Sequence, residues 1–211
     1  MSAAALLATT AAFSTSNHVR AGEIKTGDLE KAAKQQRNIY TMLSTWAQDA
    51  HQQFPNLPGD ANANFRELFK KKLFDETSES WFAVPNDGLL ASGKPDGDIG
   101  NRPDFAKALE PGEYSIAYVA GLNTSSDSDL PMLIGGAGLA TGWITGVDKT
   151  PPAVPFKGSV VITYLGGQTF IATPGPDGKI MKMKHGKLLD IFSAEYGTKP
   201  ENIRLPAVAK K

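Results

Sequence analysis

Residues 28–54 carry the pattern that most constrains what this chain can fold into. Apolar side chains recur there with the three-and-four spacing of an amphipathic helix, and polar side chains such as Gln35 fall on the opposite face. The apolar stripe consists of Leu29, Ala32, Ala33, Ile39, Tyr40, Leu43, Trp46, Ala47, Ala50 and Phe54. A Pro- and Gly-rich stretch follows directly and predicts that the helix ends at Phe54. Such a helix needs an apolar surface to pack on, and we expect Leu43 and Trp46 to be buried against it.

Four later segments have the composition of β-strands. Residues 113–120 alternate large and small side chains and are rich in strand formers, and residues 130–134 form a short apolar run. Residues 159–164 and 168–172 flank Leu165-Gly166-Gly167, which favours a compact hairpin because glycine accepts the positive φ of such turns. We expect these strands to form a small antiparallel sheet that receives the long helix.

Shorter elements complete the predicted fold. A capping-box pattern at Asn64 indicates a short helix through Leu73, and residues 81–85 are predicted as a strand. Residues 188–196 are predicted as a last helix, while the Gly- and Pro-rich residues 92–111 should lie at the surface. The predicted class is α+β, with a long N-terminal helix packed on a small antiparallel sheet and irregular loops at its edges.

The chain has 211 residues, enough for one domain of ordinary size with a real core. We expect an N-terminal arm over residues 1–27 and a single globular domain over residues 28–211. Within the arm, Ala3–Phe13 is apolar but shorter than the ~20 residues that span a bilayer, and it lacks the basic start of a signal peptide. It is either an unstructured terminus or the remnant of a longer apolar helix.

Composition and motifs exclude several functions. Lys plus Arg equal Asp plus Glu at 22 each, so no global charge draws the chain to nucleic acid. The absence of cysteine excludes disulfides, thiolate metal sites and a cysteine nucleophile. The histidines lack metal-binding spacing, and no G-x-S-x-G elbow or matched pair of carboxylates is present. We therefore expect no catalytic residues and no enzyme activity.

Asp127 and Asp129 are the candidate metal ligands. They lie in the polar run Asn123–Asp129 with Ser126 and Ser128, and such loops offer the hard oxygen atoms that calcium takes. The EF-hand pattern is not met, and a solvated turn is the alternative interpretation. Calcium is the one cofactor that this loop suggests.

The long helix and the segments after it resemble a known family. The run KQQRNIYTMLSTWAQD at residues 34–49, followed by Phe54-Pro55, resembles the helix end of type IV pilin-like proteins and type II secretion pseudopilins. The likeness to prepilin-type proteins of planctomycete and verrucomicrobial bacteria continues over residues 65–74, 82–85, 114–119, 126–131 and 158–172. Relatives usually carry D-G-H-V in the hairpin, where this chain has Gly166-Gly167-Gln168-Thr169.

The resemblance implies a pilin-like fold and a non-catalytic structural subunit of a type IV pilus-like or type II secretion pseudopilus filament. Its partners would be other pilin or pseudopilin subunits, with no nucleic acid. It would reach the membrane through a longer N-terminal helix, of which Ala3–Phe13 is the remnant. Its location would be the cell envelope, at the inner membrane and periplasm or the cell surface. The alternative function is a secreted or periplasmic binding module whose ligand surface is formed by loops 92–111 and 123–155.

Overall fold

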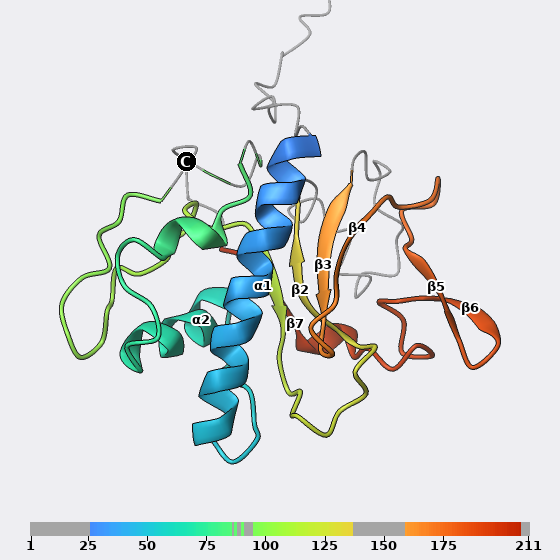
Figure 1. Cartoon of the computed structure of the whole chain (residues 1–211), viewed down its shortest axis with the longest axis horizontal. Helices are drawn as coiled ribbons and strands as arrows, with labels where there is room; N and C mark the ends of the chain where they lie inside the picture. The colour runs from blue at the N-terminus through green and yellow to red at the C-terminus, as the bar shows by residue number, and fades with distance from the viewer. Residues whose placement is uncertain (1–25, 86, 88–89, 91–94, 137–158, 208–211) are drawn as a thin grey trace, which may run out of the picture.

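The computed structural model describes residues 26–85, 87, 90, 95–136 and 159–207. One long helix, α1 (Thr26–Asp49), lies along one face of a five-stranded antiparallel sheet with the strand order β4-β3-β2-β1-β7 (Figure 1). The strands are β1 (Ile116–Val119), β2 (Pro131–Gly135), β3 (Val160–Tyr164), β4 (Thr169–Ala172) and β7 (Ile203–Arg204). The predicted strands near residues 116, 131, 160 and 169 are confirmed, and so is the α+β class with a helix on an antiparallel sheet.

Smaller elements flank this central layer on both sides. Helix α2 (Ala61–Lys70), the 3-10 helix η1 (Glu79–Phe82) and the irregular chain that follows lie on one side of α1 (Figure 1). The two-stranded sheet of β5 (Met181–Lys184) and β6 (Lys187–Asp190) lies on the other side. Another 3-10 helix, η3 (Pro200–Asn202), precedes β7.

The apolar stripe of α1 forms one wall of the core. Ile39 and Leu43 are fully buried, and the stripe residues Leu29, Ala32, Ala33 and Ala47 are also buried. Trp46 was predicted to be buried, but it is only partly buried, at the edge of the core. Gln35 was expected on the solvated face but is buried, because its side-chain Nε2 donates to the Ser80 carbonyl at 3.2 Å. The helix therefore packs against η1 as well as against the sheet.

Polar side chains fasten α1 to the β3–β4 hairpin. The fully buried Gln36 donates from Nε2 to the Val161 carbonyl at 3.3 Å and accepts from Thr163 Oγ1 at 3.0 Å. Tyr40 donates its hydroxyl to the Leu165 carbonyl at 2.7 Å. Gly167 has φ +83°, and a Cβ there would lie 3.0 Å from the Tyr40 ring. The glycine in this turn is thus required by both backbone conformation and space.

Helix α1 ends at Asp49 and not at the predicted Phe54. His51 and Gln52 adopt positive φ angles of 53° and 65°, and the Gln52 amide donates back to the Ala47 carbonyl at 2.8 Å. Gln53 then pairs with Asn123, and the Phe54 amide donates to the Leu122 carbonyl at 3.3 Å. Phe54 is buried as predicted, but pairing with a distant segment places it there rather than helix continuation.

Of the three shorter predicted elements, one helix is present with an earlier start, and the other two predictions are wrong. Helix α2 starts earlier than predicted because Asp60 caps it, accepting from the Ala63 amide at 3.2 Å. The predicted strand at residues 81–85 begins instead within η1, and the Val84 amide donates to the Ser115 hydroxyl at 2.8 Å. The predicted helix at residues 188–196 is β6 followed by turns.

The segment predicted to be surface, residues 92–111, contributes to the core. Its described part begins at residue 95, and within it Phe105, Ala108 and Leu109 are buried. The Gly- and Pro-rich composition correctly indicates irregular backbone, but these three side chains turn inward. The prediction of a wholly exposed loop is therefore wrong.

Leu43→Ala should lower the free energy of unfolding by about 2–5 kcal/mol, because it leaves a cavity between α1 and the sheet. Urea unfolding followed by circular dichroism measures this change. Thr45→Ala, on the exposed face of the same helix, is the matched control and should change stability by no more than about 0.5 kcal/mol. Similar small effects for both variants would show that Leu43 does not carry the packing.

Candidate functional site

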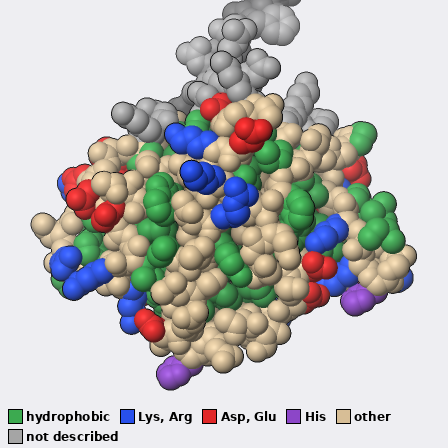
Figure 2. All heavy atoms as spheres, in the orientation of Figure 1, with side chains coloured by type: hydrophobic (Ala, Val, Ile, Leu, Met, Phe, Trp, Pro, Cys, Tyr) green, Lys and Arg blue, Asp and Glu red, His purple; other side chains and the backbone are tan. Residues whose placement is uncertain are grey.

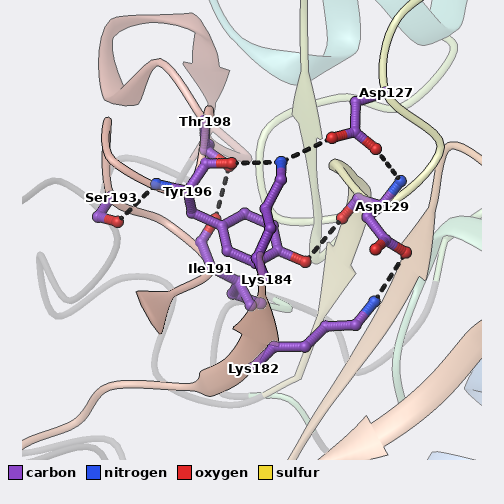
Figure 3. Close-up of polar contacts among 8 residues, drawn as sticks. All are labelled: Asp127, Asp129, Lys182, Lys184, Ile191, Ser193, Tyr196 and Thr198. Carbon is purple, nitrogen blue, oxygen red and sulfur yellow. Dashed lines mark hydrogen bonds and ion pairs between the residues drawn. The ribbon is translucent and has the colours of Figure 1, made fainter. Parts of the chain in front are cut away.

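The candidate ligands Asp127 and Asp129 lie in the loop between β1 and β2, opposite strand β5. Asp127 Oδ2 is 2.7 Å from Lys184 Nζ, and Asp129 Oδ1 is 3.0 Å from Lys182 Nζ (Figure 3). The other carboxylate oxygen of Asp127, Oδ1, accepts the Asp129 amide at 2.9 Å. The ion pair with Lys184 holds the pKa of Asp127 below its usual value. Both predicted ligands are therefore engaged by lysine ammonium groups.

Strand alternation explains why these lysines point inward. Successive side chains of a strand face opposite sides, so Lys182 and Lys184 turn toward the loop while Met181 and Met183 turn to solvent. The Lys184 side chain is only 10% exposed, and its Nζ also donates to the Tyr196 carbonyl at 2.6 Å. Its ammonium lies 4.5 Å from the centroid of the Tyr196 ring, a favourable cation–π distance.

The C-terminal segment after β6 completes the network. The Tyr196 hydroxyl donates to the Asp129 carbonyl at 3.1 Å, and the Tyr196 amide donates to Ser193 Oγ at 3.1 Å (Figure 3). Thr198 Oγ1 donates to the Ile191 carbonyl at 2.5 Å. The β1–β2 loop is thus joined to two segments that lie more than 50 residues further along the chain, strand β5 and the turns after β6. We call this arrangement the Lys–Asp network.

Calcium binding by Asp127 and Asp129 stays a prediction. The structure shows which contacts of these carboxylates an ion would have to replace. An ion would have to displace both ammonium groups from the carboxylates. Ser126, the third expected oxygen ligand, accepts the Asn123 amide at 3.1 Å. Lys184 already places a positive charge among the Asp127 carboxylate and the Tyr196 carbonyl, which are the oxygen types that calcium takes. The network therefore needs no metal to be electrostatically balanced.

A second cluster of carboxylates was not predicted from the sequence. Glu79, Asp96 and Glu113 each place a carboxylate oxygen within 4.8 Å of the others. Glu79 accepts the Leu109 amide at 2.6 Å and the Gly97 amide at 3.0 Å. These residues are far apart in the sequence and sit in no known motif, so no local signal brings them together.

Glu113 organises the same region by accepting two backbone amides. Its Oε1 accepts from Asp96 at 3.3 Å and its Oε2 from Glu110 at 2.7 Å. Burial, reinforced by the charges of Glu79 and Asp96, raises the pKa of Glu113 to about 7. Burial also raises the pKa of Glu79. Near neutral pH the cluster can therefore hold a proton, while its hydrogen bonds order residues 95–113.

Two cavities border the loops that the sequence predicts for ligand binding. The larger, about 500 Å³, lies between the end of α2 and residues 99–105, with Phe69, Phe74 and Phe105 among its aromatic lining. Its charged lining residues are Lys72, Asp75, Glu76 and Arg102. The smaller, about 180 Å³, lies beside Leu122 and Ser126. Residues 137–155 of the second predicted loop lie outside the described residues.

Comparison with family models, with curated proteins and with solved structures finds no match to this chain. Among the helices of the described ranges, none has the length and apolar composition needed to cross a membrane. The apolar segment Ala3–Phe13 and most of the predicted arm lie outside the described residues. The class that the structure defines is thus an α+β protein with one long helix on an antiparallel sheet.

Lys184→Met should lower the free energy of unfolding by about 1–3 kcal/mol, because it leaves the Tyr196 carbonyl and Asp127 without their cation. Chemical unfolding measures the loss, and proteolysis should cut residues 181–199 sooner. Lys187→Met is the control on the same hairpin, since the Lys187 side chain is 72% exposed and pairs with an exposed Glu195. Its effect should stay within about 0.5 kcal/mol. Equal effects would show that the network does not secure this region.

Stability should fall as the pH rises from about 4.5 to about 7, because folded Glu113 keeps its proton to a pKa of about 7 while the unfolded side chain loses it near 4.5. The native state binds more protons in this window, so the slope of unfolding free energy against pH is negative. The loss reaches up to about 3 kcal/mol. Glu113→Gln should flatten the slope measured by urea unfolding at several pH values, whereas Glu110→Gln, at an exposed neighbour, should leave it unchanged.

Proposed function

We propose that this chain is a structural, non-catalytic subunit of a pilus-like or type II secretion pseudopilus filament in the cell envelope. The observation that carries the proposal is the packing of α1 along one face of the antiparallel sheet. The N-terminal end of α1 lies at the edge of the globular body (Figure 1). This is the arrangement that the resemblance implies for a filament subunit.

The hydrogen bonds between α1 and the β3–β4 hairpin support the same proposal. In a filament subunit, the long helix has to keep one position on the sheet of the globular domain. Apolar contacts alone are non-directional and do not fix that position. The Gln36 and Tyr40 hydrogen bonds fix its register against β3 and the hairpin turn. Helix α1 is therefore held in one register on the globular domain, as suits a subunit whose helix packs in a filament while its globular domain faces outward.

The runner-up function is a secreted or periplasmic binding module. The cavity of about 500 Å³ favours it, because residues 99–105 of the predicted ligand loop supply part of its lining. A volume of this order is in the range of small-molecule sites. Its charged lining residues include both signs, which suits a polar ligand.

Fusion of an apolar helix of ~20 residues to the N-terminus tests the filament proposal. Expressed with a prepilin peptidase and an assembly ATPase, the fusion protein should fractionate with the membrane, and cysteines introduced in the added helices should cross-link. The matched control carries two aspartates in the middle of the added helix, which makes insertion unfavourable. A fusion protein that stays soluble and gives no cross-links would contradict the filament function and favour the binding module.

A further inference from the structure

Strand β4 is one of the two edge strands of the central sheet, and it lacks the features that usually keep an edge from pairing. Among the described strands it pairs with β3 alone. The other edge strand, β7, has only two residues, one of them Arg204. Proteins protect exposed edges with short strands, charged side chains, proline or bulges. Residues 168–173 contain no charged residue and no proline, and the pairing of β4 with β3 has no shift in register.

The hydrogen bonds of the β3–β4 hairpin show which backbone groups of β4 point outward. The Tyr164 amide donates to the Gln168 carbonyl at 2.8 Å, so these two residues form a hydrogen-bonded pair. Such pairs alternate along an antiparallel ladder, so every second residue from Gln168 bonds to β3. The amides and carbonyls of Thr169, Ile171 and Thr173 therefore point away from β3. Within the described part of the chain, no hydrogen bond to these backbone groups is present.

Exposed apolar side chains are concentrated on the flank of the molecule where this edge lies. Phe170 and Ile171 are 54% and 42% exposed. The neighbouring β5–β6 hairpin carries three more: Met181, Met183 and Leu188. Figure 2 shows hydrophobic side chains at the surface over this hairpin. In the described ranges, Leu57 is the other large apolar side chain with such exposure, and it lies between α1 and α2. A group of exposed apolar residues of this kind marks a contact surface.

We infer that β4 pairs antiparallel with β4 of a second copy of this chain, so that the two five-stranded sheets become continuous. Outward-pointing amides and carbonyls along an edge are complementary to another strand. A second copy of β4 supplies a strand that carries no charge into the contact. The contact needs only the folded domain, so it goes beyond the proposed filament function and does not depend on it.

A twofold axis at Ile171 makes this edge complementary to itself. Ile171 then forms a hydrogen-bonded pair with Ile171 of the second copy, and Thr169 pairs with Thr173, so all the outward-pointing residues take part. Between these pairs, the large Phe170 lies opposite the small Ala172. Both exposed apolar side chains of β4 are covered, one on each face of the joined sheet. A contact in which one patch meets itself is closed, so it produces a dimer.

Sedimentation velocity on the full chain at several protein concentrations tests the contact. Wild-type protein should form dimers that ~300 mM salt does not weaken, because uncharged groups carry the pairing. Ile171→Lys should weaken dimerisation by about tenfold or more, since like charges would lie opposite each other at the axis. Leu57→Lys is the matched control at an exposed apolar residue elsewhere and should dimerise as wild type does. A monomeric wild type, or undiminished dimerisation of Ile171→Lys, would overturn the contact.

A proline substitution tests the backbone groups of the edge directly. The Ile171 amide points away from β3, so Ile171→Pro removes a donor of the proposed pairing without removing a bond of the β3–β4 ladder. The variant should be monomeric and keep the circular dichroism spectrum of the folded protein. A folded variant that still dimerises would contradict the pairing, and if the variant does not fold, Ile171→Lys decides.

Cysteine substitutions locate the axis, since the chain has no cysteine of its own. Ile171→Cys should form a disulfide-linked dimer under mild oxidation, because the Cα atoms of a hydrogen-bonded pair lie about 5.5 Å apart, within the range of a disulfide. A mixture of Phe170→Cys and Ala172→Cys proteins should form a mixed disulfide. Arg204→Cys, on β7, is the control and should stay monomeric. Cross-linking of Arg204→Cys but not of Ile171→Cys would place the contact at the other edge and overturn the inference.

Discussion

The structure depends on the contact between α1 and the β3–β4 hairpin. Ile39 and Leu43 supply its apolar burial, but Gln36 gives it direction by hydrogen bonding to both Val161 and Thr163. A buried amide is costly unless its partners are present, so it favours one register of the helix over all others. Neighbouring elements extend from this contact: η1 packs beside α1, and β2 and β1 continue the sheet from β3.

The sequence predicted those parts of the fold that periodicity controls. The stripe through Leu43 located α1, and the glycine turn at Gly167 located the hairpin, because both signals are local. The end of α1 was missed because Gln53 pairs with Asn123, a partner that no local pattern shows. The β5–β6 hairpin was missed because its charged residues Lys182 and Lys184 face inward, so its alternation runs opposite to that of an ordinary half-buried strand.

In the candidate sites, too, the sequence indicated local features and missed the contacts between distant segments. Asp127 and Asp129 were identified as oxygen ligands from one polar loop, but their lysine partners come from a strand that the sequence did not predict. The cluster of Glu79, Asp96 and Glu113 is assembled only by the folded chain, and its carboxylates accept backbone amides of an irregular segment. Local composition can indicate which side chains could act as oxygen ligands. The groups that neutralise those carboxylates come from distant segments and are set by tertiary structure.

The two charge arrangements differ in what they do for the folded chain. In the Lys–Asp network each carboxylate meets a cation within the same molecule, and the geometry joins the β1–β2 loop to the C-terminal segment. In the cluster of Glu79, Asp96 and Glu113, by contrast, Glu79 and Glu113 each accept two backbone amides of residues 95–113. Burial and the neighbouring carboxylates raise the pKa of Glu113 to about 7, so a bound proton can relieve the repulsion between these groups near neutral pH. The Lys–Asp network is therefore balanced by ammonium groups of the same chain, whereas the carboxylate cluster is balanced by backbone amides and by protonation.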